Sequence, residues 1–116
     1  MNMDEDIHLT QKDIDFVQTS GRKKIEEAAY HFVRTKLAPS EPEHDGEQTP
    51  KEGHPVFKAQ HATGTDSRLS LNESMGIETG RPLTEEEIDR VVDTIMNWIS
   101  NQLEATGKKQ AKIKEF

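Results

Sequence analysis

Cysteine is absent from the sequence, and tryptophan and tyrosine occur once each. The absence of cysteine excludes disulfide frameworks, thiol nucleophiles and cysteine-ligated zinc sites, and it is typical of proteins in a reducing compartment. Long apolar runs are also missing, since no stretch approaches the roughly 18 apolar residues that a membrane-spanning helix needs. The first residues, Met1 to Asp6, are acidic where a signal peptide would be basic. We therefore expect a cytoplasmic protein that is neither secreted nor inserted in a membrane.

Hydrophobic residues are scarce as well, at 31% of the 116 residues, where ordinary globular domains have roughly 45% with glycine included. The length fits one domain, so part of the chain should be solvated loop or tail. The net charge of −7 disfavours non-specific binding to nucleic acid, because lysine and arginine drive phosphate contacts. Residues 108–116 differ, with four Lys and one Glu. These patterns predict a flexible N-terminal segment at 1–9, one helical domain at 10–107 and a basic flexible tail at 108–116.

Two helices are predicted in the first third of the chain. Thr10 is followed three residues later by Asp13, a spacing typical of a capping box, and this predicts a helix over 11–19. Ser20-Gly21 interrupts it, and apolar residues then recur at the three- and four-residue spacing of one helical face. The second helix should end near Leu37, because Ala38 precedes a proline. The apolar residues of its face are Ile25, Ala28, Ala29, Phe32, Val33 and Leu37.

Residues 39–53 form a long polar loop, since they contain three Pro, two Gly, six charged residues and no large apolar side chain. Asp45-Gly46 and Thr49-Pro50 are typical of turns. Loops of this length often bind ligands when they are ordered. Two interpretations stay open, a segment that only closes the chain and a binding loop with its neighbours. The candidate residues for binding are Asp45, Gln48, His54, Gln60, His61 and Arg68.

The second half of the chain begins with two short helices. Pro55 suits the first position of a helix, although a short extended segment is an alternative there. Thr65 or Asp66 should cap a further short helix that carries Leu69 and Leu71. Gly76 should end this helix, because glycine readily adopts the left-handed conformation found at helix ends.

The last helix is the clearest element of the sequence. Thr84 and Glu87 have capping-box spacing, and an apolar stripe follows for about five turns before Gly107, where the helix should end. Trp98 falls beside the stripe, and we expect it in the core because large aromatic residues usually bury. The stripe consists of Ile88, Val91, Val92, Ile95, Met96, Ile99 and Leu103.

The sequence predicts an all-α fold, a small irregular or orthogonal bundle of about four to five helices with the polar loop at 39–53. No segment shows the two-residue alternation of a half-buried strand, and no internal repeat occurs. The two amphipathic helices need each other to cover their apolar faces.

Several segments of the sequence have distinctive combinations of residues. They are Leu37-Ala-Pro-Ser, Asp45-Gly-Glu-Gln-Thr-Pro50, Gly53-His-Pro-Val-Phe-Lys-Ala-Gln-His-Ala-Thr63, Gly76-Ile77, Gly80-Arg-Pro-Leu-Thr-Glu-Glu-Glu-Ile88 and Ile95-Met-Asn-Trp-Ile99. Over roughly residues 25–99 the chain resembles an uncharacterised prokaryotic family, domain of unknown function 4186. The resemblance therefore implies a scaffold but no activity.

The resemblance also implies a cluster of three Cys and a Trp-His pair, at positions that here are Asp66, Ser67, Ser70, Ser74 and Met75. Thiolates and imidazoles are the ligands that Zn²⁺ favours, whereas neutral serine is a poor zinc ligand and methionine offers only a soft thioether. We therefore predict a variant that keeps the scaffold without a metal. A remnant Zn²⁺ or Mn²⁺ site built from His54, His61 and Asp66 is the alternative.

Two roles are open for the side chains of His54 and His61. Seven residues apart, they would lie on the same side of a helix after about two turns, either as co-facing ligands or as two hydrogen-bonding supports. His54 precedes Pro55 at the end of the polar loop, so its ring can bond to backbone and hold the return of the loop. We favour the supporting roles for both.

Three functional hypotheses follow. The favoured one is a non-catalytic helical protein that binds a macromolecular partner, with a protein as the possible partner, because no nucleophile elbow, phosphate loop or metalloprotease helix occurs. The second is a metal-dependent hydrolase or nuclease in which His54, His61, Asp66 and Glu73 supply ligands and base. The third is nucleic-acid binding, which the overall acidity disfavours, through the basic tail and the start of the second helix at Arg22, Lys23 and Lys24.

Overall fold

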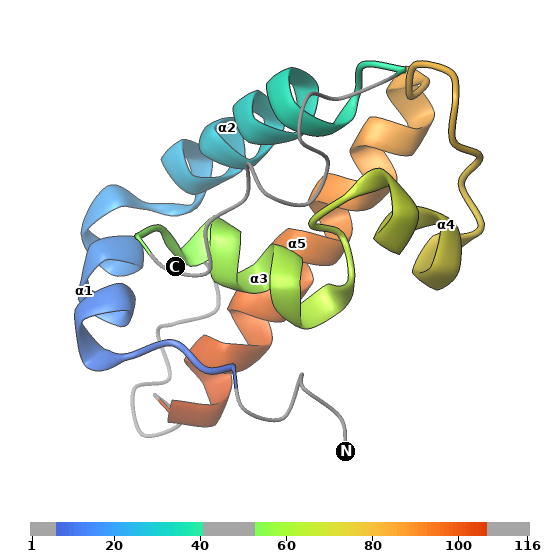
Figure 1. Ribbon diagram of the computed structural model, residues 1–116. Helices are drawn as coiled ribbons and strands as arrows, with labels where there is room; N and C mark the ends of the chain where they lie inside the picture. The colour runs from blue at the N-terminus through green and yellow to red at the C-terminus, as the bar shows by residue number, and fades with distance from the viewer. Residues whose placement is uncertain (1–6, 41–52, 107–116) are drawn as a thin grey trace.

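All regular secondary structure described in the computed structural model is helical (Figure 1). The structure describes residues 7–40 and 53–106, and no strand occurs within them. The helices are α1 (Gln11–Ser20), α2 (Arg22–Phe32), the π-helical turn η2 (Val33–Leu37), α3 (Pro55–Thr63), α4 (Arg68–Met75) and α5 (Glu85–Thr106). The all-α prediction is confirmed.

Some predictions fall on residues outside the described ranges. They are the flexibility of residues 1–6, most of the polar loop with Asp45 and Gln48, the end of the last helix at Gly107, and the basic tail at 108–116. Leu9, which the sequence placed in the N-terminal segment, is 6% exposed in the core. Its N–H donates to Oε1 of Gln102 at 3.0 Å. The chain therefore joins the core one residue before the predicted start of the domain.

Both predicted capping boxes are present. Asp13 N–H donates to Thr10 Oγ1, and Thr10 N–H donates to Asp13 Oδ2. At α5, Glu87 N–H donates to Thr84 Oγ1 and Thr84 N–H donates to Glu87 Oε1. Arg81 adds two charge-assisted hydrogen bonds to Glu87, at 2.8 and 2.7 Å, and lowers the pKa of that carboxyl to about 2. These reciprocal bonds satisfy N–H groups that helix ends leave without partners.

The helix predicted at Pro55 is confirmed, and the extended alternative is wrong there. The predicted cap of α4 is also wrong, because Ser67 occupies that position and accepts the N–H of Ser70. Thr65 and Asp66 are engaged elsewhere. The Thr65 hydroxyl lies 2.9 Å from that of Thr63, and Oδ2 of Asp66 lies 3.2 Å from Nδ1 of His61.

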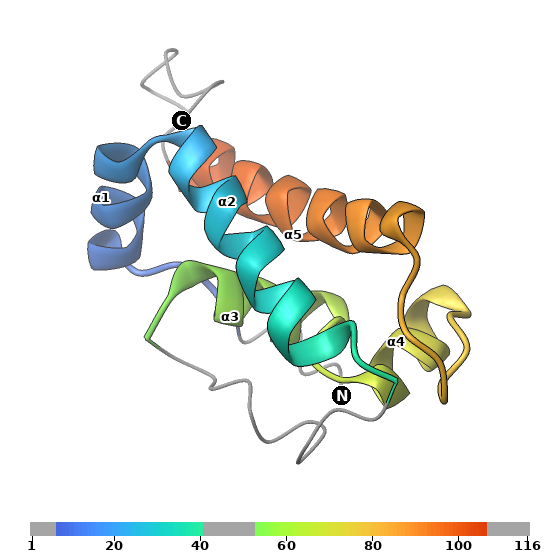
Figure 2. The ribbon, with the colours of Figure 1, turned by 90° about the horizontal axis from the view of Figure 1, so that it is seen from above.

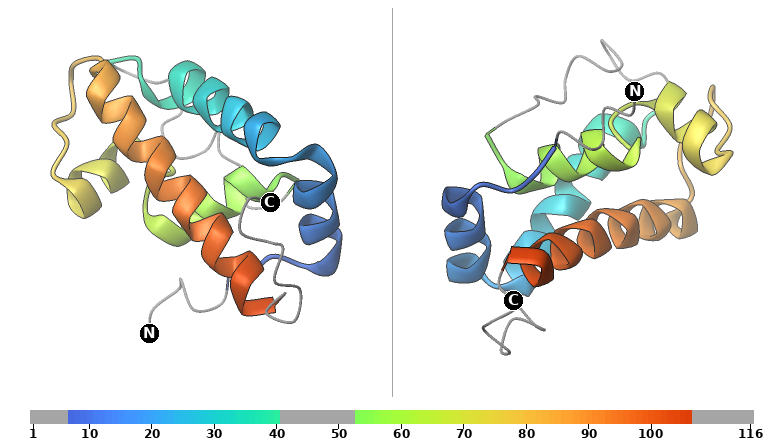
Figure 3. Two further views of the ribbon diagram at one scale, coloured as in Figure 1. Left: turned by 180° about the vertical axis from the view of Figure 1, so that it is seen from behind. Right: turned by 90° about the horizontal axis from the view of Figure 1, so that it is seen from below.

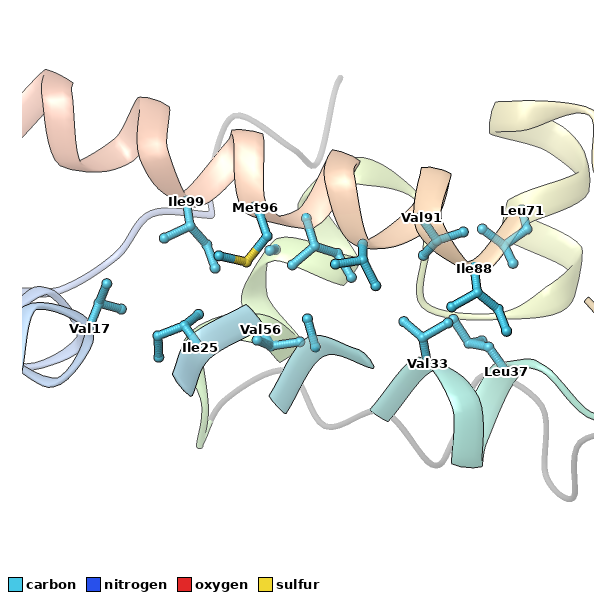
Figure 4. Close-up of a cluster of buried hydrophobic side chains, with 14 of the residues drawn as sticks. Val17, Ile25, Val33, Leu37, Val56, Leu71, Ile88, Val91, Met96 and Ile99 are labelled. Atoms are coloured by element: carbon cyan, nitrogen blue, oxygen red, sulfur yellow. The ribbon is translucent and has the colours of Figure 1, made fainter. Parts of the chain in front are cut away.

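The core forms where α2 and α3 pack against α5. Figure 4 shows the apolar side chains of α5 facing those of α2, η2, α3 and α4. Every residue of the predicted α5 stripe is buried, as expected, while Trp98 is only partly buried against the core. α5 presents charged residues on its other faces, and no helix within residues 7–40 and 53–106 is long and apolar enough to cross a lipid bilayer.

α1 and α4 lie at opposite ends of the molecule (Figures 1, 2 and 3). Gly21, at φ 89°, joins α1 directly to α2, a backbone conformation that glycine adopts without steric cost. On α4, Leu71 is buried whereas Leu69 is 60% exposed. Residues two apart on a helix point in nearly opposite directions, so only one of these leucines can face the core.

Candidate functional site

Four rings from three parts of the chain meet on one side of the molecule, and we call them the aromatic patch: Phe16, Phe32, His54 and Phe57. His54 is central, with ring centroids 5.3 Å from Phe16, 5.4 Å from Phe32 and 5.8 Å from Phe57. The Phe32 and Phe57 centroids are 4.7 Å apart. Phe16 remains 45% exposed, and the other three side chains are partly exposed. The patch is therefore an apolar surface open to solvent.

Local structure fixes these rings. Phe16 lies on α1 between the buried Ile14 and Val17, which hold that helix against the core. Phe32 ends α2, and His54 is the N-cap of α3, in which Phe57 lies. The patch thus assembles only when α1, α2 and α3 have packed together.

His54 combines a supporting role with its place in the patch. Its Nδ1 accepts the N–H of Val56 at 3.1 Å, which caps α3. Burial lowers the pKa of His54 below its usual value, and nearby Asp13 opposes that shift. Because Nδ1 must be unprotonated to accept a hydrogen bond, the cap also favours the neutral ring. The predicted bond between the His54 ring and backbone is present, and it is made to the first turn of α3.

The lowered pKa of His54 predicts a loss of stability on acidification. Above about pH 6.5 the imidazole is neutral in both folded and unfolded chains. As the pH falls below that value, the unfolded chain takes up a proton at His54 before the folded chain does. Unfolding is then favoured, and the loss continues until the pH reaches the folded pKa. Denaturant titrations from about pH 7.5 to pH 5 should show this decline.

His54→Asn is the control for this prediction. Asparagine keeps a side-chain acceptor suited to an N-cap but does not titrate. We expect a flatter dependence of the free energy of unfolding on pH in this variant than in the wild type. Parallel curves for the two proteins would assign the pH dependence to other groups.

Cations border the aromatic patch. Nζ of Lys36 lies 5.9 Å from the Phe32 centroid and 5.6 Å from the Phe57 centroid. Nearby, Lys58 forms an ion pair of 2.5 Å with Asp13. Burial opposes ionisation of Asp13, but Lys58 and the capping N–H of Thr10 hold its pKa below the ordinary value. The Asp13 carboxylate is therefore ionised, and Lys58 balances its negative charge within the fold.

The other predicted site residues lie around the turn between α3 and α4. Nδ1 of His61 lies 3.2 Å from Oδ2 of Asp66, so the structure brings this pair together. It does not bring His54 to them, because the described residues contain no group of three or more His, Asp or Glu that could hold a metal ion. Gln60 is 1% exposed and donates its amide N–H to Thr65 O. Glu73 is exposed on α4.

Arg68 lies in the interior, 2% exposed. Its Nη1 donates to Leu37 O at 3.2 Å and to Pro39 O at 2.8 Å, and its Nη2 donates to Glu78 O at 2.7 Å. The guanidinium therefore ties α4 to the end of η2 and to the segment after α4. Gln60 and Arg68, both proposed from the sequence as binding residues, lie inside the protein rather than on its surface.

The positions at which the family resemblance implied metal ligands do not suit zinc. Ser67 Oγ donates to Ser70 Oγ at 3.0 Å while capping α4, and Ser74 Oγ donates to Gly64 O at 2.8 Å. Asp66 pairs with His61. Neutral hydroxyls that already form hydrogen bonds are weak substitutes for thiolates. The donor set therefore does not fit a tetrahedral zinc site.

The basic residues proposed for nucleic acid lie together at the start of α2. Arg22, Lys23 and Lys24 are all exposed, and Gly21 provides no side-chain cap. This places them at the corner between α1 and α2.

Sequence reasoning found His54 but not the remainder of the aromatic patch. One feature of the sequence could have indicated the patch: Phe16 is a large aromatic residue at a position of α1 that was not expected to be buried. Phe32 had been assigned to the buried face of α2, where it is partly exposed instead. The contact between Phe16 and His54 joins residues far apart in the chain, so helical spacing alone could not reveal it.

The fold and the patch define a small all-α protein with an exposed aromatic surface. The profile of the family described as Domain of unknown function (DUF4186) matches residues 1–100. The chain belongs to this family, and the resemblance found in the sequence is confirmed. No solved structure shows significant similarity to the chain.

Proposed function

We propose that this member of a family of unknown function is a non-catalytic helical protein that binds a protein partner through the aromatic patch. The exposure of Phe16 beside three further rings is the observation that carries the proposal. Aromatic residues are enriched at binding surfaces, where they offer a large apolar area for the loss of few rotamers. Phe16 is the exposed anchor, and the rings around His54 form the surface against which a partner side chain packs.

The engagement of the polar candidates supports a binding role over catalysis. His54 caps a helix, Arg68 binds backbone carbonyls, and Ser67 caps α4. A catalytic group must be available to a reacting atom, whereas these side chains stabilise the scaffold. The absence of cysteine also supports our inference of a cytoplasmic location.

Substitution of Phe16 tests the proposed function. Peptides selected from a random phage-displayed library on the wild-type protein are synthesised, labelled and measured by fluorescence anisotropy. We expect Phe16→Ala to weaken their binding by roughly tenfold or more, as for the loss of a central interface aromatic. Because Phe16 is 45% exposed, circular dichroism should show an intact helical fold.

Leu69→Ala is the matched control. Leu69 is also a large exposed apolar residue, but it lies on α4, at the end of the molecule opposite α1 (Figures 1 and 2). Its truncation should leave peptide binding unchanged. If the selected peptides bind both variants as tightly as the wild type, or if selection enriches no peptide, the proposed function is wrong.

The contact between His61 and Asp66, 3.2 Å from Nδ1 to Oδ2, favours the metal-dependent hydrolase or nuclease as the second candidate. Imidazole and carboxylate suit Zn²⁺ or Mn²⁺, but two ligands hold such ions weakly. Nucleic-acid binding through Arg22, Lys23 and Lys24 stays a prediction that the net charge of −7 disfavours.

We predict that the protein folds without a metal. A ligand that binds only the folded state raises the midpoint of thermal unfolding, so addition of a chelator should leave that midpoint unchanged. Elemental analysis of protein purified without chelator should find no stoichiometric zinc or manganese. A bound metal whose removal lowers the midpoint by many degrees would shift the assignment to the metal-dependent candidate, with His61 and Asp66 as the first ligands to substitute.

A further inference from the structure

A single residue, Gly21, separates α1 from α2. Gly21 has φ 89° and ψ 158°, a backbone conformation that residues with a side chain almost never adopt. At this residue the chain turns, so that α1 leaves the line of α2 (Figures 1 and 2). We call α2, α3 and α5 the body, because α1 packs at one end of them. One glycine therefore determines whether α1 and α2 form a corner or one straight helix.

The chain around Gly21 suits a straight helix as well as a corner. Gly21 N–H donates to Val17 O and Ile25 N–H donates to Gly21 O, so hydrogen bonds with α-helical spacing flank the turn. No described side chain caps the start of α2, and an uninterrupted helix would give the N–H groups of that first turn the last carbonyls of α1 as partners. The buried residues of the two helices would also lie within about a third of the circumference of one helix. They are Ile14, Val17, Ile25 and Ala29.

A small set of described contacts holds α1 against the body. Two of its ten residues are buried, Ile14 and Val17, whereas α5 buries its whole apolar stripe. Asp13 of α1 also forms an ion pair with Lys58 of α3. The capping box of α1 lies within its own first turn, so the helix keeps this cap when it moves. Elements with few buried apolar contacts open more readily than core helices.

We infer that α1 is a hinged strap, which undocks from the body by straightening at Gly21 and carries Phe16 away from the other rings of the aromatic patch. When α1 is docked, the Phe16 and His54 rings lie 5.3 Å apart and the patch is complete. When α1 is undocked, it continues α2 as one helix. The inference concerns the free protein and does not rest on the proposed function. It gives the patch a complete and an incomplete form, and a partner that contacts Phe16 selects the complete one.

Single cysteines introduced into this cysteine-free chain measure the opening. Val17→Cys and Val92→Cys each place one thiol at a fully buried position, the first on α1 and the second on α5. We expect a thiol reagent in native buffer to label Val17→Cys at least roughly tenfold faster than Val92→Cys. The reason is that α1 opens by itself, whereas α5 becomes accessible only when the whole chain unfolds.

Two glycine variants separate local opening from unfolding. Gly21 has φ 89° and Gly76, at the end of α4, has φ 71°, and at both positions the described residues leave an added Cβ without contacts within 4 Å. Gly21→Ala strains the docked corner and should accelerate the labelling of Val17→Cys by roughly tenfold or more. Gly76→Ala strains the body instead, so it should change that rate by less than about twofold while accelerating the labelling of Val92→Cys.

The labelling rates decide the inference. If Gly21→Ala leaves the rate at Val17→Cys unchanged, or if Gly76→Ala accelerates it as much as Gly21→Ala does, α1 opens only with the whole chain and the hinged strap is excluded. Amide hydrogen exchange of the wild type gives a second measurement in case Val17→Cys itself loosens α1. The amides of α1 should then exchange faster than the slowest amides of α5, and equal protection excludes the strap.

Peptide binding to Gly21→Ala distinguishes this inference from the proposed function. Opening of α1 removes Phe16 from the patch, so this variant should bind the library-selected peptides more weakly than the wild type, while circular dichroism shows that its helices are kept. If α1 opens in Gly21→Ala and those peptides still bind as tightly, the strap stands and the aromatic patch is not the binding site.

Discussion

Arg68→Met should lower the free energy of unfolding by about 3 to 5 kcal/mol, because three backbone carbonyls lose their hydrogen bonds to one buried charged donor. Methionine fills a similar length but donates no hydrogen bond. The carbonyls of Leu37, Pro39 and Glu78 would then lose the guanidinium that donates to all of them. Urea denaturation of both proteins measures the difference.

Two further variants test the reason for this effect. Arg68→Lys keeps the charge but replaces the planar fork with one ammonium, so its stability should fall between those of wild type and Arg68→Met. Arg90→Met removes an exposed arginine from α5 and should change stability by less than about 0.5 kcal/mol. A cost for Arg68→Met no larger than that of Arg90→Met would mean that the buried hydrogen bonds contribute nothing to stability.

Ile95→Ala should lower the free energy of unfolding by about 2 to 4 kcal/mol. Ile95 is fully buried in the middle of the α5 stripe. Truncation removes apolar contacts and leaves a cavity that close-packed neighbours fill only in part. The measurement is again a denaturant titration, with the dependence on denaturant fitted separately for each protein.

Glu86→Ala is the comparison for Ile95→Ala. Glu86 lies on the same helix but is exposed, so its removal should cost less than about 0.5 kcal/mol. Equal costs for the two variants would contradict the assignment of the buried face of α5. That face was derived from spacing alone, and the structure places every residue of the stripe in the core.

The features that the sequence predicted are those decided by residues close together in the chain. The capping pairs Thr10 with Asp13 and Thr84 with Glu87 each lie within four residues, and both form as expected. The α5 stripe repeats over about five turns, long enough for the helical period to be unambiguous. Pro55 begins α3 because its fixed φ suits the first turn of a helix.

The cap of α4 was predicted at the wrong residue, although all the candidates are neighbours in the chain. Thr65, Asp66 and Ser67 are all suitable capping residues by type, so the choice depends on what surrounds each one. His61 engages Asp66, and the turn after α3 engages Thr65. Only Ser67 is left to accept the N–H of Ser70. These partners lie within five residues in the chain, but they meet only through the turn after α3, whose conformation the residue types do not specify.

The candidate site was less predictable than the fold because its residues meet only in the tertiary structure. Phe16 and His54 belong to segments that helical spacing treats separately, and their contact depends on how α1 packs beside α3. The interior position of Arg68 was also missed, because arginine is almost never fully buried unless it is paired. Its partners here are backbone carbonyls, which carry no signature in the sequence.

The π-helical turn η2 changes the phase of the helix that it ends. Ala38 N–H donates to Val33 O, five residues back instead of four. Each further residue of an α-helix turns by about 100°, so removal of one residue here would rotate the last carbonyls away from their present direction. Leu37 O, the last carbonyl of η2, and Pro39 O, two residues beyond it, accept from Arg68. The hydrogen bonds that hold α4 therefore depend on the number of residues in one turn of another helix, so a deletion at Val33–Leu37 would disturb a helix that lies outside it.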